Sequence, residues 1–310
     1  MSVVSVICLY GSVDYESELA AIRELCLECL GERLGPKVAA LAQRGFMLKP
    51  ASDGALPTGR CQVRGPALLE PGTPWPENRA GVPLTVVAVL DTDALAPWLG
   101  DELPARPGLV NIFHLDPDPQ YDEDPRFAET LGRYRKWSRR FDTDLDCQIV
   151  LADPARAVEV SAPAPARTFE RRLLHAAPVI TLPSVDGELV DPVLETLDYR
   201  IEPEFDDDDW QPPAERFVQE PFRGVWWDHC RTVLRLGCEG RWFRAAQAFG
   251  WPYIDTWLMD KKDEEYTHLL TLPGDILGPR EDGVHRVMVP ASALRTGDFT
   301  DVVYEIDGLH

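Results

Sequence analysis

Residues 84–93 have the sequence LTVVAVLDTD, and this stretch decides the fold class. The run from residue 84 to residue 90 is rich in apolar, β-branched side chains, which predicts a strand buried on both faces. Comparable runs predict further strands at residues 2–10, 108–115, 147–151, 267–272, 284–289 and 302–306. Because short turns or long irregular segments join these strands, with helices at intervals, the sequence predicts an α+β fold of predominantly antiparallel β-sheets with flanking helices.

Helical patterns occur in four places. Residues 14–30 and 36–44 predict two helices with stop signals at Gly31 and Gly35 between them. Residues 125–141 predict an amphipathic helix, and residues 168–175 predict a helical turn. Cys26 and Cys29 fall on the apolar face of the first helix, so this CxxC pair predicts buried thiols rather than a zinc site.

The chain also shows a division into two parts. A segment rich in Ala and Pro predicts a connector at residues 153–167 between an N-terminal lobe, residues 1–152, and a C-terminal lobe, residues 168–310. The two lobes share a loose pattern that pairs Gly65-Pro66 with Gly250-Trp251, Asp91 with Asp275, and Gly108 with Gly283. We therefore formulate the hypothesis that the lobes are loosely duplicated.

The charge of the chain limits its partners. With 52 acidic and 31 basic residues, the net charge is −21, which repels phosphate backbones and anionic membrane surfaces. We therefore expect no nucleic acid and no membrane as a partner, and the negative field would steer a basic protein inward. The first apolar run follows no positively charged segment, and no run is long enough to span a bilayer, so the sequence predicts a cytoplasmic location.

Asp91 and Asp93 are the sharpest catalytic candidates. A strand that ends in Asp-x-Asp is how haloacid-dehalogenase-type phosphatases present a nucleophile, here Asp91, and a general acid, here Asp93, with Mg²⁺ to offset the charge. The alternative is an aspartate that caps the turn after the strand. Ala94-Leu95 stands where that class carries Gly-Thr, and the chain has no nucleophile elbow, P-loop or Rossmann fingerprint. The sequence therefore favours a non-enzymatic protein without a cofactor.

Two acidic segments are candidates for cation or partner binding. Asp116, Asp118 and Asp122 supply oxygen ligands, but they lack the spacing and the glycine of an EF-hand, so a solvated loop is the alternative. In the second segment, large aromatic rings accompany consecutive carboxylates, which is typical of an interface for a basic protein. The residues predicted for this interface are Asp206, Asp207, Asp208, Asp209, Trp210, Trp226 and Trp227.

Two stretches resemble the YwqG-like family of uncharacterised bacterial proteins, a domain of unknown function. The first carries Trp75-Pro76, Gly81-Val82-Pro83-Leu84, the strand ending at Asp91, Leu103-Pro104 and Gly108-Leu109. The second carries Gly250-Trp251-Pro252, Leu269-Leu270, Asp282-Gly283 and the ending Asp298-Phe299-Thr300-Asp301-Val302. Val89 stands where the family usually has Gln, and Thr271-Leu272-Pro273 stands where it has Gln-x-Asp.

The resemblance implies an α+β fold with antiparallel sheets but no established activity. Members of the family are often encoded near toxin genes, which implies a role in toxin immunity. Taken with the charge, this favours a protein-binding module that neutralises a basic toxin. The alternatives are a Mg²⁺-dependent phosphatase that uses Asp91 and Asp93, and a scaffold or regulatory protein without a toxin partner.

Overall fold

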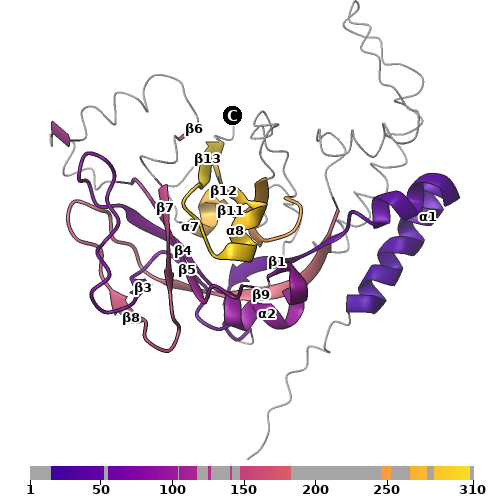
Figure 1. The fold of residues 1–310 in the computed structure, drawn as a ribbon, viewed down its shortest axis with the longest axis horizontal. Helices are drawn as coiled ribbons and strands as arrows, with labels where there is room; N and C mark the ends of the chain where they lie inside the picture. The colour runs from indigo at the N-terminus through magenta and orange to yellow at the C-terminus, as the bar shows by residue number, and fades with distance from the viewer. Residues whose placement is uncertain are drawn as a thin grey trace, which may run out of the picture.

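The fold is one large antiparallel sheet with one long helix, α1, and several short helices beside it (Figure 1). This computed structural model describes residues 15–51, 55–103, 105–116, 125–126, 140–141, 147–182, 246–252, 266–277 and 283–307. The sheet has 11 strands in the order β6-β13-β12-β11-β10-β1-β9-β2-β4-β5-β7, and β3 pairs with β8 in a separate ribbon. All the recorded pairings are antiparallel, so the predicted α+β class is confirmed.

The bounds of the elements follow the chain. The strands of the large sheet are β1 (Gln43–Pro50), β2 (Gln62–Val63), β4 (Thr85–Asp91), β5 (Leu109–His114), β6 (Arg140–Phe141), β7 (Cys147–Ala152), β9 (Arg172–Thr181), β10 (Ala246–Ala248), β11 (Tyr266–Pro273), β12 (Val284–Pro290) and β13 (Val303–Asp307). The ribbon consists of β3 (Ala67–Leu69) and β8 (Val158–Val160). The helices are α1 (Tyr15–Ala39), α2 (Thr92–Leu99), α7 (Gly274–Leu277) and α8 (Ala291–Thr296), with a 3₁₀ turn η1 (Gly100–Glu102).

The strongest apolar runs form strands as predicted. They give β4, β5, β7, β11, β12 and β13, and every residue of β4 is buried, as a strand covered on both faces requires. The predicted strand at residues 2–10 lies outside the described residues. Most of the predicted helix at residues 125–141 is also outside them, but its last two residues form β6 on β13 instead of helix.

Two predictions of local structure are wrong. Residues 36–44 were expected to be helical throughout, but α1 ends at Ala39 and β1 begins at Gln43. Residues 168–175 were expected to form a helical turn, but β9 starts at Arg172. Both strands pair with each other over residues 43–50 and 174–181, so long-range pairing overrides a weak local preference.

The described structure shows an internal repeat. Strands β9-β2-β4-β5-β7, the first half, and β1-β10-β11-β12-β13, the second half, follow the same order outward from the central β1–β9 pair. Their registers also agree: Gln62 pairs with Val89 as Gln247 pairs with Thr271. Each half has a bulge at the same place, after Val86 and after His268. An approximate two-fold axis therefore passes through the Lys49–His175 pair of the central strands.

One detail of the sequence-derived repeat needs correction. Thr92 and Gly274 each donate their backbone N–H to a glycine carbonyl, that of Gly108 at 2.9 Å and that of Gly283 at 2.8 Å. Asp93 is therefore the counterpart of Asp275, and Asp91 occupies the position of Pro273. The prediction of separate lobes at residues 1–152 and 168–310 stays a prediction, and the sheet joins strands from both.

A shared turn follows β2 and β10. The buried amide nitrogen Nε2 of Gln62 donates to the carbonyl oxygens of Arg64 and Pro66, at 2.9 and 2.8 Å. Nε2 of Gln247 donates to those of Phe249 and Trp251 in the same way, at 2.9 and 2.7 Å. Each turn contains two consecutive residues with positive φ, the second of them a glycine. The glutamine side chain thus holds a backbone conformation that would be strained on its own.

Each central strand also reaches a helix of the other half. Nη1 of Arg44 in β1 donates to the carbonyl oxygen of Leu99 at 3.0 Å, at the end of α2. Nη1 of Arg172 in β9 donates to that of Ile276 at 3.1 Å, near the end of α7. Cations at helix C-termini are favourable because carbonyl groups there lack partners. The two contacts tie the halves together across the axis.

The core has two parts on opposite faces of the first half. The larger part combines residues from both halves with α1 and α2, and includes Ile112, Val287 and Tyr304. The smaller part lies under the β3–β8 ribbon and includes Phe113, whose ring meets Trp75 edge to face. The sheet curls around the larger part until β5, next to one edge, touches β13, next to the other. None of the helices among the described residues is long and apolar enough to cross a membrane.

Candidate functional site

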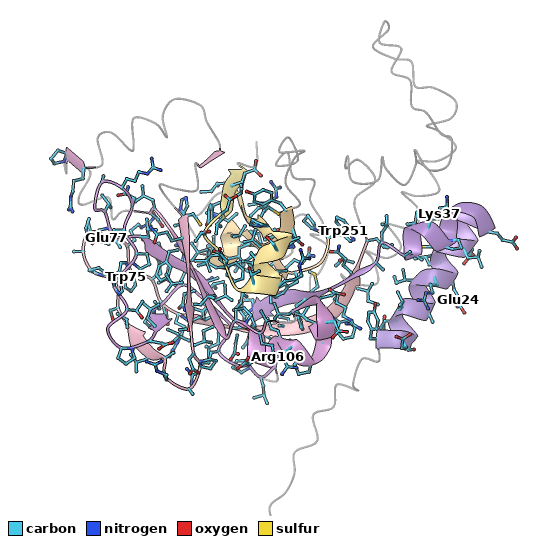
Figure 2. The ribbon with its side chains drawn as sticks, in the orientation of Figure 1. Glu24, Lys37, Trp75, Glu77, Arg106 and Trp251 are labelled. Carbon is cyan, nitrogen blue, oxygen red and sulfur yellow. The ribbon has the colours of Figure 1, made fainter. Side chains whose placement is uncertain are left out.

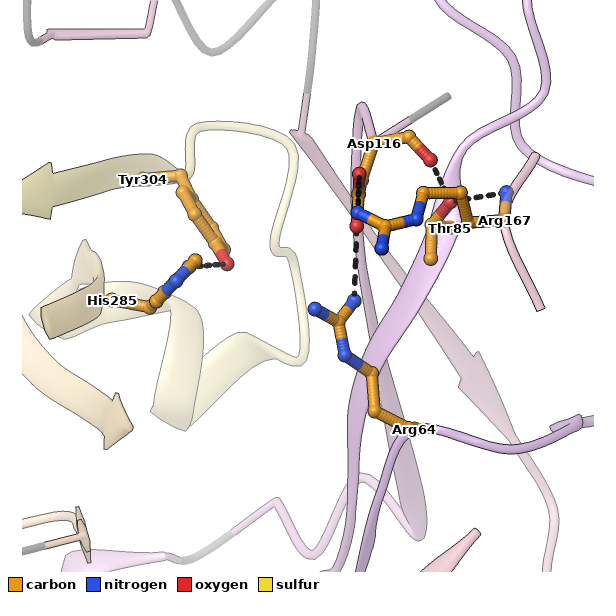
Figure 3. A network of polar contacts seen from close by, with 6 residues as sticks. All are labelled: Arg64, Thr85, Asp116, Arg167, His285 and Tyr304. Atoms are coloured by element: carbon orange, nitrogen blue, oxygen red, sulfur yellow. Dashed lines mark hydrogen bonds and ion pairs between the residues drawn. The ribbon is translucent and has the colours of Figure 1, made fainter. Parts of the chain in front are cut away.

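A group of polar side chains lies where the sheet nearly closes (Figure 3). We call it the closure cluster: Arg64, His114, Asp116, Arg167, His285 and Tyr304. These residues come from β5, β12, β13 and the segments after β2, β5 and β8, so only the folded sheet brings them together. Arg64, His114, His285 and Tyr304 are buried in a core that is otherwise apolar.

Arg64 occupies the centre of the cluster in a constrained conformation. Its φ is 58°, a left-handed value that non-glycine residues rarely adopt, and the amide of Gln62 bonds its carbonyl. The side chain is only 3% exposed. Figure 3 shows the guanidinium group between the Asp116–Arg167 pair and the His285–Tyr304 pair. Strained backbone and a buried charge at one residue are typical of functional positions.

Two guanidinium groups share one carboxylate. Nη1 of Arg167 lies 3.0 Å from Oδ1 of Asp116, and Nη1 of Arg64 lies 3.5 Å from its Oδ2. The ring of Phe169 lies beside both arginines, with its centroid 4.0 Å from Cζ of Arg64 and 4.6 Å from Cζ of Arg167. Thr85 fixes the backbone here, because its hydroxyl donates to the carbonyl of Asp116 at 2.6 Å and accepts from the N–H of Arg167 at 3.1 Å.

Three rings join the two halves of the sheet. His114 stacks on Tyr304 with ring centroids 4.1 Å apart, and Nδ1 of His285 lies 2.8 Å from the hydroxyl oxygen of Tyr304. Burial lowers the pKa of His285 to about 3, with a smaller contribution from the charge of Arg64. Burial also lowers the pKa of His114 well below its usual value, and electrostatic interactions with His285 and Arg64 lower this pKa further, because a second positive charge beside either residue is unfavourable. Both imidazoles are therefore neutral at pH 7.

The repeat gives an internal control for this cluster. The position of Arg64 is taken by Phe249 in the other half, since both donate their N–H to the bulged residue of the next strand, Val87 or Leu269. By strand register, the positions of His114, His285 and Tyr304 are taken by Val289, Val110 and Ile149. The same backbone is thus built with apolar side chains at the equivalent positions, so the fold does not require the polar ones.

A second polar group occupies the other face of the second half. Arg286, which is fully buried, lies 3.4 Å from Oε2 of Glu305, and Nε2 of His268 lies 2.8 Å from the hydroxyl of Thr271. Their counterparts in the first half are Asn111, Val150, Val86 and Val89. Asn111 bonds both the N–H and the carbonyl of Leu68 in β3 at 2.8 Å. The face that holds the β3–β8 ribbon in one half is therefore a polar face in the other.

Asp91 caps a helix. Its Oδ1 accepts from the N–H of Ala94 at 3.2 Å and its Oδ2 accepts from the N–H of Arg60 at 2.9 Å, so both oxygens bind the backbone. The side chain of Cys61, whose pKa burial raises to about 12, accepts from the N–H of Asp91. This is the arrangement of an N-cap residue for α2.

Asp93 lies at an open surface depression. The depression has a volume of about 400 Å³, and its other charged residues are Glu70, Arg106 and Asp153. Glu70 is engaged by Arg156 at 2.8 Å and by the N–H of Asp153. Arg106, which Figure 2 labels near α2, precedes β5, whereas His114 and Asp116 of the closure cluster lie at the other end of that strand.

The remaining sequence candidates divide between described and undescribed residues. Asp116 belongs to the closure cluster, whereas Asp118 and Asp122 lie outside the described residues, as do Asp206 to Asp209, Trp210, Trp226 and Trp227. Over the ranges that the structure describes, no three His, Cys, Asp or Glu side chains are placed to hold a metal ion. Trp75 and Trp251 (Figure 2) are structural, since each indole N–H donates to a backbone carbonyl, that of Leu84 or Leu41.

Fold and cluster together define a two-fold repeated antiparallel sheet protein with an asymmetric buried polar centre. The chain belongs to the family of domain of unknown function DUF1963, which matches residues 61–308. No curated protein matches the chain. The matched range contains both sequence-derived β regions and excludes β1, the strand at the middle of the sheet.

Proposed function

We propose that this protein is a binding module for a basic protein surface and not a catalyst. The observation that carries the proposal is the net charge of −21. Arg64 and Arg286 point inside and pair there with Asp116 and Glu305, and two such pairs of opposite charge leave the acidic excess unchanged. A partner therefore meets a surface with a large acidic excess, which favours fast association with a basic protein.

The finer parts of this proposal come from the sequence. The predicted contact residues are Asp206, Asp207, Asp208, Asp209, Trp210, Trp226 and Trp227. The resemblance to YwqG-like bacterial proteins makes a cytoplasmic immunity protein that neutralises a basic toxin the leading form of this proposal. The aromatic residues would supply buried contact area, and the carboxylates would supply steering.

The test is affinity purification from the native host at low and at high salt. We expect a basic protein that is retained at low salt and released at high salt. Neutralising Asp206 to Asp209 with Asn should weaken capture, whereas changing Glu16, Glu18, Glu24 and Glu28 on α1 to Gln removes the same charge elsewhere and should weaken it much less. Equal weakening by the two variants, or capture insensitive to salt, would contradict a defined acidic interface.

A second candidate function rests on the depression beside α2. Asp93 reaches solvent there, as the general acid of a Mg²⁺-dependent phosphatase would have to. Against this, both oxygens of Asp91 already accept backbone hydrogen bonds. Hydrolysis of generic phosphoesters by the wild type, lost in Asp91→Asn, would establish the phosphatase and overturn the binding-only function. Asparagine is also a good N-cap residue, so this variant should keep α2.

A further inference from the structure

Strand β7 forms one edge of the large sheet. It pairs with β5 on one side and is the last strand in the order of the described strands. Ile149 and Val150 of β7 are partly exposed. Tyr304 and Glu305, the equivalent residues of β13, are buried. In an antiparallel strand with one neighbour, every second residue directs its backbone N–H and C=O away from that neighbour, so β7 presents a row of donors and acceptors along its outer edge.

The other half of the sheet shows what such an edge can hold. Strand β6 pairs antiparallel with β13 through Tyr304 and Glu305, whereas no described strand occupies the equivalent edge of β7. The register of the repeat places the corresponding pairing at Ile149 and Val150. Because the two halves share one backbone, an edge that accepts a strand in one half has the geometry to accept a strand in the other.

The outer edge of β7 is not used by the hydrogen bonds that the strand makes elsewhere. Beyond its ladder with β5, the side chain of Gln148 donates to the carbonyl of Glu77 at 2.7 Å, and the carbonyl of Val150 accepts from Asn111 at 3.2 Å. The first bond is made by a side chain, and the second is made to β5 itself. Within the described ranges, the outward backbone groups of residues 148–152 are therefore available for pairing.

The edge ends at the depression beside α2, which the last two residues of β7 help to line. Arg156 pairs with Glu70 at 2.8 Å, so the charge of the lining is set by Asp93 and Asp153 against Arg106. The balance is negative. A strand antiparallel to β7 would begin at this end, because the depression lies where β7 finishes. A basic side chain at the start of that strand would meet Asp93 and Asp153.

We propose that the outer edge of β7 is a docking site for an extended segment of a basic protein. The segment adds a strand antiparallel to β7 and places a lysine or arginine side chain in the depression. Backbone pairing supplies affinity, and the carboxylates supply the preference for a cation. The inference rests on the proposed function for the charge of the partner, but the edge shares no residue with the contact residues predicted at 206–210, 226 and 227.

The experiment uses the full chain and two synthetic peptides at constant ionic strength. The first peptide alternates Lys and Thr over the length of β7. The second has the same sequence with two adjacent central residues N-methylated, which removes backbone donors from both edges of the peptide strand and keeps its charge. Hydrogen exchange of individual backbone amides is followed by NMR. We expect the first peptide to slow exchange roughly tenfold at every second amide of β7, and the second peptide to leave it unchanged.

Variants of the depression test the preference for a cation. Asp93→Asn combined with Asp153→Asn should weaken binding of the first peptide about fivefold, because two exposed charge contacts are lost. Arg106→Gln removes a repelling charge and should strengthen binding about twofold. The matched control is Glu16→Gln combined with Glu18→Gln, which removes two charges from exposed positions on α1 and should change the affinity much less.

Four results would overturn the proposal. Two of them are the absence of binding by the first peptide and binding that leaves exchange in β7 unchanged. The third is equal binding of the N-methylated peptide, which would show that charge alone attracts it. The fourth is slow exchange in β7 that develops with protein concentration and without peptide, which would identify a second copy of this chain as the occupant. Failure of the proposed function is observed separately, in the affinity purification from the native host.

Discussion

The two halves of the sheet share a backbone but differ in what their interiors contain. Inside the first half, Val110 and Ile149 pack as ordinary apolar core residues; inside the second half, His285 and Tyr304 stand at the same positions. Phe249 in the second half is likewise apolar where the first half has Arg64. At each of these positions, the apolar residue of one half shows what is sufficient to build the fold, and the polar residue of the other half shows what has been added. The additions converge on one place, the closure cluster.

Acid sensitivity should give the largest difference between the halves. The folded pKa of His285 is about 3, below the ordinary value of 6.5, so as pH falls the unfolded chain takes up this proton first. The free energy of unfolding therefore falls from pH 6.5 toward pH 3, and His285 contributes ~2 kcal/mol of this loss by pH 5. His285→Val, which copies Val110, should reduce the difference in stability between pH 7 and pH 5 by that amount in urea titrations.

The control for this prediction is His175→Val, because His175 is a partly exposed histidine at the two-fold axis and lies outside the closure cluster. An unchanged pH dependence in His285→Val would contradict the neutral, buried state assigned to this ring.

The turns after β2 and β10 should lose similar stability when the glutamine that holds each of them, Gln62 or Gln247, is replaced. Gln62→Leu and Gln247→Leu each remove hydrogen bonds to two backbone carbonyls, and each should lower the free energy of unfolding by ~2–3 kcal/mol. Chemical denaturation of both variants measures the effect. A large loss in one and none in the other would break the equivalence of the repeats at this turn.

Replacing the two arginines that reach across the two-fold axis, Arg44 and Arg172, should lower the free energy of unfolding by different amounts. Arg44→Leu should cost ~1–1.5 kcal/mol, since Cζ of Arg44 also lies 3.7 Å from the ring centroid of Tyr15. Arg172→Leu should cost ~0.5 kcal/mol, because its side chain donates to carbonyl oxygens of the short helix α7. Arg→Lys at either position should recover part of the loss if the charge near the carbonyls matters, and urea denaturation can resolve this order.

The smallest effect should come from the acidic residues that begin the paired helices. Asp93→Asn removes a negative charge near the N-terminus of α2 and should cost ~0.3–0.5 kcal/mol. Asp275→Asn in the single-turn α7 should cost less, because a shorter helix has a weaker dipole. Thermal melts of both variants compare them directly, and a larger loss at Asp275 would reverse the expected order.

Sequence patterns predicted the strands whose apolar runs are continuous, and the structure explains which strands they missed. β4 and β12 are buried along most of their length, and buried strands have a strong signal. β1 contains Arg44, Gly45, Lys49 and Pro50, which dilute that signal, and it follows directly on a helical pattern. Its partner β9 contains Ala176, Ala177 and Pro178. Such strands are specified by their pairing with each other, which no local window contains.

The closure cluster was not predicted, for a related reason. Asp116 was recognised only as a member of an acidic segment, and His285 only as part of the predicted strand at residues 284–289. In the structure His268 bonds Thr271 and the backbone after β10, while His285 bonds Tyr304. The one local signal was Gly65 after Arg64, because a glycine there marks the turn that aims the arginine inward. The other contacts of the closure cluster depend on the curvature of the sheet, which brings β5 next to β13.

The position of β1 in the sheet determines which residues the domain needs in order to fold. The DUF1963 match starts at residue 61, yet β1 hydrogen-bonds to both β9 and β10 and is the only described strand between them. A fragment that contains only residues 61–308 would lack β1 and would leave the facing edges of β9 and β10 unpaired. Unpaired strand edges can pair with other chains and cause aggregation. Soluble production should therefore depend on retaining the N-terminal residues, and their loss should be rescued by supplying residues 43–50 as a separate peptide.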